Sequence, residues 1–462
     1  MKKRPNILFL MTDQHRFDVS GFAGNPVVRT PHLDRLASDA AVFTNAYAPA
    51  PICVASRQCM AAGQLPKTCN CIGMNDVDVG EHYMTLPRRF SQYGYATVCS
   101  GKLHILGPDQ MQGWTTRIAA MNDIEVAPQF IDGLVEKPLA RELAGWNWSK
   151  ELQTAGPGVN LWGERDRFSV EGALQYIDMF FNGPWYDRQT PERPLFLKVS
   201  LSIPHYPYRC DADKFRYYIN RVSPYENDVR SDHPGLRFGA FDDAVTPREI
   251  QRAIAAYYGL VVQADDHFGH LLEALDNAGQ DLDDWIIVFT SDHGDMLGEH
   301  GIFHKVVFYE GSVRVPLFIR MPKRFAGCQI DKNVNLCDIF ATLCDLCEVP
   351  VPDNLDSRSL APLMIGDESS CAAWSNETVS TIGRPATVMI KQDNLKYMYY
   401  ESGAPELLFD LDRDPGETQS FLQAPEYEKH LAHFRRRLGE LGFGPGADRN
   451  YRNASYESNA TI

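Results

Sequence analysis

The run Trp285-Ile286-Ile287-Val288-Phe289-Thr290 is followed at once by the polar cluster Ser291-Asp292-His293-Gly294-Asp295. A short run of β-branched and aromatic residues of this kind predicts a buried strand. Other apolar runs that predict strands are Ile7–Met11, Ala96–Ser100, Leu195–Leu201 and Leu317–Met321. Helical patterns lie between them, including Thr30–Ala40, Thr85–Tyr93, Ser169–Phe180 and Pro247–Asn277. This alternation predicts an α/β fold with a large, mostly parallel or mixed sheet between helices.

The character of the sequence changes after residue 348. Glu348–Leu355 is a proline-rich connector, and the strand-like segments Thr387–Gln392, Leu395–Tyr400 and Leu407–Leu411 follow before a charged helical segment, Glu426–Leu441. We therefore predict a large α/β domain, residues 1–348, and a small C-terminal α+β subdomain with an antiparallel sheet, residues 349–462. The polar tail from Arg449 onward is expected to be mobile or to contact another subunit of a homo-oligomer.

Composition excludes several classes of protein. The chain has 462 residues and a net charge of −15, so it lacks the basic character of a nucleic-acid-binding protein. No apolar run approaches the roughly 20 residues of a membrane span, so no membrane partner is expected. The apolar run Ile7–Met11 is too short for the core of a signal peptide, which predicts a cytoplasmic protein.

The eleven cysteines do not suggest a disulfide framework in a cytosolic chain of this length. Cys344 and Cys347 form a C-x-x-C pair, so a zinc site is an alternative to consider. The segment Cys337–Cys347 has the spacing of an amphipathic helix, however, and this favours cysteines that pack on its apolar face.

Polar clusters follow four of the predicted strands directly. They are Asp13-Gln14, Gly101-Lys102-Leu103-His104, Ser202-Ile203-Pro204-His205-Tyr206-Pro207 and Ser291-Asp292-His293-Gly294-Asp295. Each cluster alone is more simply interpreted as a cap or a surface loop. Because ligands gather at the carboxyl ends of strands in open α/β sheets, the four clusters together predict one binding site.

The residue types in these clusters indicate anion chemistry. The predicted metal cage consists of Asp13, Gln14, Asp292 and His293. Oxygen ligands suit Ca²⁺, Mg²⁺ or Mn²⁺, and an imidazole shifts the preference toward Mn²⁺ or another transition metal. Positive charge and proton donors come from Lys102, His104, His205 and Lys305, and Arg57 adds a cation near Cys53. A tetrahedral anion held between a divalent metal and lysines is a common arrangement for sulfuryl or phosphoryl transfer.

The segment Cys53-Val54-Ala55-Ser56-Arg57 resembles the C-x-P/A-x-R signature of the type I, formylglycine-dependent sulfatases of the alkaline phosphatase superfamily. Alone, the pattern is weak, since a buried cysteine beside a helix start is usually a small apolar residue. Further blocks that resemble this family, in the family's order, are Asn6–Gln14, Gly101–His104, Asp292–Gly301, Tyr309–Pro316 and Leu408–Thr418. Gly107–Trp114 and Pro204–Tyr208 look most like choline-sulfatase relatives.

The resemblance implies an alkaline-phosphatase-like sandwich, a sulfatase catalytic domain over residues 1–348 and hydrolysis of a small anionic sulfate ester. It implies that a formylglycine-generating maturase oxidises Cys53 and that the hydrated aldehyde is the nucleophile. Cys53 then also becomes a metal ligand, beside Asp13, Gln14, Asp292 and His293. Ca²⁺ is the expected ion, with Mn²⁺ or Mg²⁺ as alternatives.

The resemblance also implies roles for the remaining catalytic residues. Lys102 and Lys305 hold the sulfate oxygens, and Arg57 orients the diol formed from residue 53. His205 protonates the leaving alcohol. His104 deprotonates the second hydroxyl, so that sulfate is expelled.

Other functions stay open at this point. Gln14 and His293 are shared with phosphonate monoester and phosphodiester hydrolases of the same superfamily. Ala55 replaces the usual proline, which ties activity to a maturase that accepts alanine, and a homologue that never converts Cys53 would be a non-catalytic anion-binding protein. The organic part of the substrate, whether choline, aryl or sugar, is not determined. The residues that we considered for its pocket are Tyr206, Tyr208, Arg209, Trp114 and Trp162, each with ordinary packing as the alternative.

Overall fold

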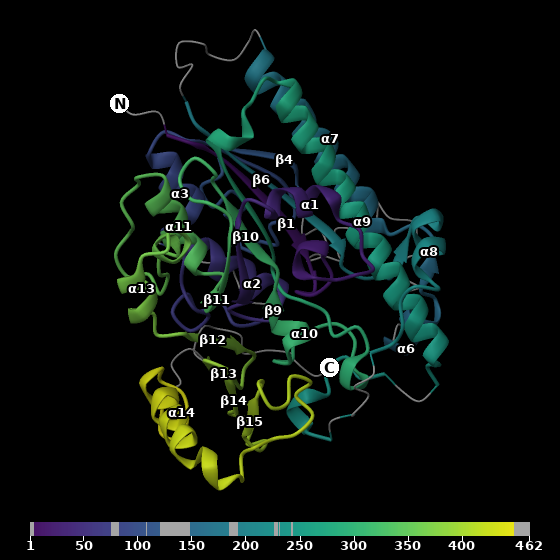
Figure 1. Ribbon diagram of the computed structural model, residues 1–462, viewed down its shortest axis with the longest axis vertical. Coiled ribbons are helices and arrows are strands. Elements are labelled where there is room, and N and C mark those ends of the chain that lie inside the picture. Colours follow the sequence, from purple (N-terminus) through teal and green to yellow (C-terminus); the bar gives the residue numbers. More distant parts are fainter. Residues whose placement is uncertain are drawn as a thin grey trace.

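The computed structural model describes residues 4–74, 83–107, 109–120, 148–183, 193–225, 230, 232–241 and 244–447. A 9-stranded sheet runs through its larger part (Figure 1). The strands are β1 (Asn6–Asp13), β2 (Ala41–Tyr47), β3 (Ala96–Gly101), β4 (Thr116–Ala120), β6 (Leu195–Pro204), β8 (Trp285–Ser291), β9 (Arg314–Val315), β10 (Leu317–Arg320) and β11 (Cys328–Asn335). Their order is β11-β2-β10-β8-β1-β6-β3-β4, and β9 pairs with β2.

Parallel pairing at the centre of the sheet places the polar clusters at one edge. Strand β1 lies between β6 and β8 and is parallel to both, with Ile7 opposite Phe196 on one side and Ile286 on the other. Strand β3 is parallel to β6. The carboxyl ends of these four strands therefore point the same way. Strand β10 is antiparallel to β8 and β2, so the sheet is mixed, as predicted.

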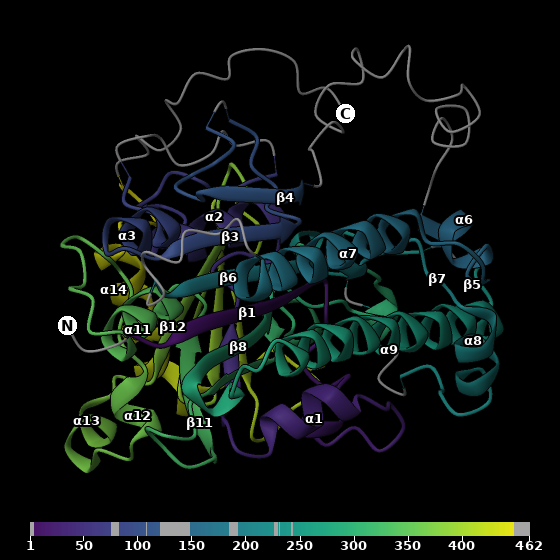
Figure 2. The ribbon, with the colours of Figure 1, turned by 90° about the horizontal axis from the view of Figure 1, so that it is seen from above.

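Helices cover both faces of this sheet because alternate side chains of the strands are buried in opposite directions. Leu8 and Leu10 of β1 pack in one apolar core, and Phe9 and Met11 pack in another. The first face carries α1 (Pro31–Ala37), α6 (Trp148–Gln153), α7 (Leu161–Asn182), α8 (Ala212–Tyr218) and α9 (Pro247–Asn277). The second face carries α2 (Cys53–Ala62), α3 (Leu86–Gln92), α11 (Asp338–Leu346), α12 (Ala361–Met364) and α13 (Glu368–Ala373). In Figure 2, α7, α9 and α1 lie on one side of the strands, and α3 and α11 lie on the other.

The structure differs from the sequence prediction at the start of one helix and in strands that were not predicted, such as β2 and β11. Helix α7 begins at Leu161 rather than Ser169, because Asn160 caps it by accepting hydrogen bonds from the backbone N–H groups of Trp162 and Gly163. Its first turns are largely exposed, so they lack the apolar spacing on which the prediction depended. Strand β11 was not predicted, since its sequence, CQIDKNVN, is mostly polar.

The C-terminal part contains a second sheet, of four antiparallel strands in the order β12-β13-β14-β15. Their bounds are Glu377–Ile382, Thr387–Gln392, Leu395–Tyr400 and Leu407–Asp410, and helix α14 spans Glu428–Glu440. One face of this sheet packs against the larger part through Met389 and Met398, and the other packs against Phe434 of α14 (Figure 1). The predicted small antiparallel sheet is confirmed.

The boundary between residues 348 and 349 stays a prediction. Leu360 and Leu363, beyond that boundary, pack in the core of the large sheet. The tail from Arg449 onward lies outside the described residues. Cys344 and Cys347 are buried in the apolar core beside α11, as the spacing predicted. Among the helices of the described residues, none has the length and apolar character needed to cross a membrane.

Candidate active site

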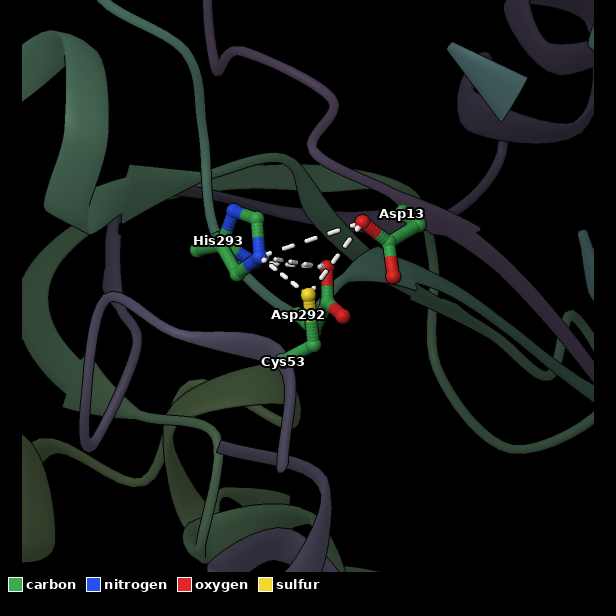
Figure 3. A group of neighbouring side chains, drawn as sticks. All are labelled: Asp13, Cys53, Asp292 and His293. Carbon is green, nitrogen blue, oxygen red and sulfur yellow. Dashed lines mark hydrogen bonds and ion pairs between the residues drawn. The ribbon is translucent and has the colours of Figure 1, made fainter. Parts of the chain in front are cut away.

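Four buried side chains from three elements converge at the carboxyl edge of the large sheet (Figure 3). They are Asp13 at the end of β1, Cys53 at the start of α2, and Asp292 and His293 directly after β8; we call them the Cys53 cluster. One ligand atom from each lies within 4.8 Å of the others. Residues separated by almost 280 positions in the sequence thus meet because their strands are neighbours in the sheet.

Helix α2 fixes the position of Cys53. The helix begins at Cys53, so the N–H groups of its first turn have no partner within the helix and favour an anion there. Ser56 Oγ donates a hydrogen bond of 2.6 Å to the Asp292 carbonyl oxygen, which ties this turn to the end of β8. The apolar face of α2 is buried among small side chains, including Ala50, Val54 and Ala55.

Arg57 joins the carboxylates of the cluster from one side. Its Nε lies 2.7 Å from Asp292 Oδ2 and its Nη2 lies 3.0 Å from Asp13 Oδ2. Its Nη1 donates to the Lys102 carbonyl oxygen and to Ser200 Oγ, both at 2.8 Å. Burial opposes the charge of Arg57, but Asp292 and Asp13 outweigh it and raise the pKa of the guanidinium. Arg57 therefore holds the two carboxylates in place as a permanent cation.

The two carboxylates use different oxygens for different partners. The Oδ2 atoms bind cationic side chains, whereas the Oδ1 atoms face Cys53 and His293 (Figure 3). Cys53 Sγ lies 3.6 Å from Asp13 Oδ1 and 3.1 Å from His293 Nε2. His293 Nε2 lies 3.8 Å from Asp13 Oδ1 and 3.7 Å from Asp292 Oδ1. Carboxylate oxygens and an imidazole nitrogen that converge in this way suit a divalent cation of the Ca²⁺, Mg²⁺ or Mn²⁺ class.

The protonation equilibria of the cluster reflect this crowding. Burial and the neighbouring Asp13 carboxylate raise the pKa of Asp292, although Arg57 opposes them. Burial would also raise the pKa of Asp13, but Lys102, His205 and Arg57 together hold it well below its ordinary value. Burial and Asp13 oppose ionisation of the Cys53 thiol, yet Lys305, Lys102 and His293 outweigh them and lower its pKa. The position of Cys53 Sγ thus stabilises an anion.

Gln14 is adjacent to the cluster, but its side chain is bonded elsewhere. Its Nε2 donates to Asp295 Oδ2 and its Oε1 accepts from Lys305 Nζ, both at 2.6 Å. Its backbone N–H donates to Asp292 Oδ1 at 3.1 Å. A role for Gln14 as a metal ligand stays a prediction. Asp295, which the sequence placed in the cluster after β8 without a role, positions Gln14 and also accepts from the Tyr208 hydroxyl at 2.7 Å.

Lys102 stands close to the Cys53 cluster because Gly101 turns the chain there. Gly101 has a φ of +93°, and a Cβ at this position would lie 2.1 Å from the Ser200 carbonyl oxygen, so only glycine is accommodated. Lys102 Nζ pairs with Asp13 Oδ2 at 2.9 Å. Burial opposes its charge, but the Asp13 carboxylate outweighs burial and raises the pKa of Lys102.

His205 follows β6 and lies beside Cys53. Its Nδ1 is 2.7 Å from the Tyr206 carbonyl oxygen, so Nδ1 carries a proton and donates, which leaves Nε2 free to face the site. Burial and the charge of Lys305 lower the pKa of His205 to about 4. The ring is therefore neutral near pH 7.

His104 differs from the other predicted residues. It is buried, with a φ of +57°, and its Nδ1 has no hydrogen-bond partner within the described part of the chain. The structure brings the other predicted site residues into mutual contact or electrostatic range, whereas it shows no such bond for His104. A buried nitrogen without a partner suits a group that bonds to a ligand.

The five residues considered for the organic part of the substrate have three different surroundings. Trp114 packs against Phe196 in the core, and Tyr208 is fully buried beside Asp295, so both are packing residues. Trp162 and Tyr206 contact the His205 ring, at centroid distances of 6.2 Å and 4.1 Å. Arg209 is exposed on β7 (Arg209–Cys210).

Comparison with known proteins bears on this site. The family model described as Sulfatase matches residues 5–349, and that described as N-sulphoglucosamine sulphohydrolase, C-terminal, matches residues 298–442. An arylsulfatase of Clostridium perfringens (strain 13 / Type A) is 29% identical and covers 94% of each chain. A choline-sulfatase of Rhizobium meliloti (strain 1021) is also 29% identical, over 91% of this chain and 83% of the relative.

The fold is shared with a phosphonate monoester hydrolase of Agrobacterium radiobacter, at a TM-score of 0.76 and 22% identity over 95% of each chain. The predicted alkaline-phosphatase-like architecture is thereby confirmed. The Sulfatase model covers most of the chain and includes every residue of the Cys53 cluster. The protein belongs to the sulfatase family.

Proposed function

We propose that this protein hydrolyses a sulfate monoester to an alcohol and inorganic sulfate, with Cys53 converted to formylglycine and one divalent metal bound. One observation carries the proposal: Cys53 Sγ lies at the start of helix α2, beside Asp13 Oδ1 and His293 Nε2, in surroundings that lower the pKa of the thiol. After conversion, an aldehyde or diol oxygen would take the place of this sulfur.

Formylglycine, once hydrated, would supply the nucleophilic hydroxyl of the reaction. A divalent cation held by Asp13, Asp292, His293 and the oxygen of residue 53 would supply Lewis-acid polarisation. Ca²⁺ suits the carboxylate oxygens best, and His293 keeps Mn²⁺ open. Gln14 would join this set only if its carbonyl oxygen gave up the hydrogen bond from Lys305.

The cations around the cluster would bind the transferred group. Lys102 Nζ forms an ion pair with Asp13 Oδ2, and the charge of Lys305 lowers the pKa of Cys53. A sulfuryl group between them would gain charge-assisted hydrogen bonds on two sides. Arg57 would keep Asp13 and Asp292 in the geometry that the cation needs.

Two histidines are proposed for proton transfer. His205 has one ring nitrogen fixed by the Tyr206 carbonyl and the other near Cys53, which suits donation to the leaving alcohol. His104, with its buried Nδ1 unbonded in the described structure, is proposed to accept the proton that releases sulfate. His205 is neutral near pH 7 without ligand, so the negative charge of a bound ester would have to raise its pKa.

Maturation is part of the proposal. Ala55 stands where the signature usually has proline, so we propose a formylglycine-generating enzyme that accepts alanine at this position. The location in the cytoplasm and the homo-oligomeric state stay predictions. The eleven cysteines are all free thiols, which suits a reducing compartment.

A substrate comparison tests the proposed reaction. Purified, matured enzyme is assayed with aryl sulfate monoesters, phosphonate monoesters and phosphate diesters, and kcat/KM is compared. The proposal expects the sulfate monoesters to be preferred, and a preference for phosphonate or phosphate diesters would replace it with the other activity of the superfamily. Cys53→Ala should abolish turnover of every ester. Cys59→Ala, on the same helix, is the matched control and should keep it.

A further inference from the structure

We infer that Trp162 and Arg165, at the start of α7, form the subsite for the organic part of the ester and select a substrate with a second anionic group. The inference rests on the proposed function, because it concerns the same site. It adds the substrate's charge and shape, which the Cys53 cluster itself does not specify.

The start of α7 is fixed against the loop that carries His205. Asn160 Nδ2 donates to the carbonyl oxygens of His205 at 3.2 Å and Pro207 at 2.7 Å. Six residues later, Asp166 accepts from the backbone N–H groups of Ser202 and Ile203, each at 2.8 Å. Trp162 lies between these two anchors, so its position relative to His205 is set by buried hydrogen bonds on both sides.

The indole ring of Trp162 borders the anion-binding residues. It meets the His205 ring nearly perpendicularly, at 83° and a centroid distance of 6.2 Å, and Lys102 Nζ lies 5.9 Å from its centroid. Lys102 and His205 are buried, Trp162 and Tyr206 are half-buried, and Arg165 is exposed. This increase in exposure from Lys102 to Arg165 indicates the direction in which an ester's organic part would leave the site.

Arg165 is a cation for which the described residues provide no anion. Its guanidinium carbon lies 4.9 Å from the centroid of Trp162, and no carboxylate pairs with it among the residues that the structure describes. Two positions further on, Arg167 pairs with Glu164 at 3.0 Å. In a chain of net charge −15, a guanidinium that lies over a ring bordering the anion-binding residues suits a ligand carboxylate or sulfate, which it can bind with two hydrogen bonds.

These features define a substrate class. The ring of an aryl group or a sugar would pack against Trp162, and a carboxylate or second sulfate on that ring would reach Arg165. A quaternary ammonium group is disfavoured, because Lys102 and Arg165 already approach the aromatic face that would otherwise attract it. The structure thus favours acidic aryl or sugar sulfates over choline sulfate.

The test uses three phenyl sulfates that differ at the para position, with a carboxylate, a methyl or a trimethylammonium group. KM and kcat of Arg165→Gln are divided by those of the unsubstituted enzyme for each ester, so that differences in leaving-group reactivity cancel. We expect KM to rise about three- to fivefold for the carboxylate, as for an exposed charge pair. KM should stay the same for the methyl ester and fall for the trimethylammonium ester. Because Arg165 does not reach the sulfuryl group, kcat should not change.

Arg167→Gln is the matched control, since it removes an exposed arginine from the same helix, and it should alter none of the three ratios. Trp162→Leu should raise KM for all three esters, and Trp162→Phe should restore most of the loss. Equal KM ratios for the three esters in Arg165→Gln would overturn the inference while leaving the proposed function intact. A sugar sulfate with a second sulfate, compared with one that carries a carboxylate, identifies which anion Arg165 prefers.

A binding measurement separates this inference from the proposed function. Calorimetry with 4-sulfobenzoate and benzenesulfonate needs no turnover and can be made on unconverted protein. Tighter binding of 4-sulfobenzoate that disappears in Arg165→Gln would support the subsite even if no sulfate ester were hydrolysed. Equal affinity for the two sulfonates would contradict it.

Discussion

Among the residues that the structure describes, two of the buried clusters of charged groups are built in opposite ways. In the Cys53 cluster, cationic side chains bind the outer oxygens of two carboxylates, and the inner oxygens face a thiol and an imidazole. In the second, which we call the Lys396 cluster, Lys396 Nζ stands between Glu310 Oε1 at 2.5 Å and Glu417 Oε1 at 2.8 Å. In the Lys396 cluster, a lysine of the chain itself lies between the two carboxylates.

The Lys396 cluster is closed by further bonds from the protein. Lys396 Nζ also donates to the Phe308 carbonyl oxygen at 3.0 Å, and the Tyr47 hydroxyl donates to Glu310 Oε2 at 3.0 Å. Glu417 Oε2 accepts from the backbone N–H of Glu310 at 2.7 Å. These bonds join strand β14 to α10 (Glu310–Val313), so the cluster fastens the small sheet to the larger part.

The comparison indicates what each cluster contributes. A charge cluster completed by its own lysine stabilises the fold, and breaking it should affect stability and leave chemistry unchanged. A cluster whose carboxylates turn their inner oxygens toward a thiol and an imidazole suits a cation from outside, and altering it should affect chemistry with little effect on stability. Substitutions in the Cys53 cluster should therefore lower activity, and substitutions in the Lys396 cluster should lower stability.

Asp292→Asn should reduce kcat/KM by on the order of a thousandfold or more, as expected for a group that acts in a catalytic unit. The folded protein should survive, because burial and Asp13 already disfavour the charge of Asp292. The lost hydrogen bond from Arg57 should lower stability, whereas relief of the repulsion from Asp13 should raise it. If the metal-free Asp292→Asn protein lost as much thermal stability as a Lys396 variant, the Cys53 cluster would also stabilise the fold, which would contradict this account.

Lys396→Met should lower the free energy of unfolding by about 3–5 kcal/mol, because it leaves buried carboxylates without their cation. The kcat/KM of the folded fraction should not change. Urea unfolding measures the first quantity and steady-state kinetics the second. Lys323→Met removes an exposed lysine that pairs with Asp281 and Asp284, and as a control it should lower the free energy of unfolding far less than Lys396→Met does.

Addition of a divalent cation should stabilise the metal-free protein, by about 2.7 kcal/mol at a concentration one hundred times the Kd. The same gain is expected in Lys396→Met and should be absent from Asp292→Asn. Thermal unfolding with and without Ca²⁺, Mn²⁺ or Mg²⁺ measures this and ranks the ions. An equal gain in all three proteins would place the ion elsewhere.

The smallest expected effect concerns pH and the Lys396 cluster. Burial and the charge of Glu310 raise the pKa of Glu417 from 4.5 to about 7, although Lys396 opposes them. Between these values the folded protein binds a proton that the unfolded chain does not bind, so the free energy of unfolding falls as pH rises through this window. In Glu417→Gln, this decrease of the free energy of unfolding with rising pH should be absent.

Between about pH 5 and about pH 8, Glu417→Gln should therefore become more stable relative to the unsubstituted protein, by about 1–2 kcal/mol in the free energy of unfolding. Denaturant unfolding at both pH values measures it. A shift in the opposite direction would show that Glu417 is stabilised in its charged form by Lys396.

Asp13, Asp292 and His293 could be placed together from the sequence because they lie at or directly after the ends of strands, whereas Cys53 entered the prediction through the family resemblance. Asp13 ends β1 and Asp292 directly follows β8, and parallel strands bring such positions to one edge of the sheet. The bonds of Gln14 were not predictable, since they depend on Asp295 and Lys305, whose side-chain directions no local pattern reveals. Trp162 was only one of several candidate aromatics, because the exposed start of α7 carries no apolar period.

The Lys396 cluster was not predicted at all. Glu310, Lys396 and Glu417 come from three separate segments, and each resembles an ordinary surface charge in its own context. Only the packing of the small sheet against the larger part brings them together. Buried charge pairs of this kind follow from tertiary structure rather than from periodicity or spacing.

Mass spectrometry of the peptide that contains Cys53 tests the central claim most directly. The peptide should come from active enzyme made in its natural host, with the peptide from Cys53→Ala as the control. The account predicts that residue 53 carries the mass of formylglycine and that the converted fraction rises and falls with specific activity. Unmodified cysteine at residue 53 in fully active enzyme would contradict it.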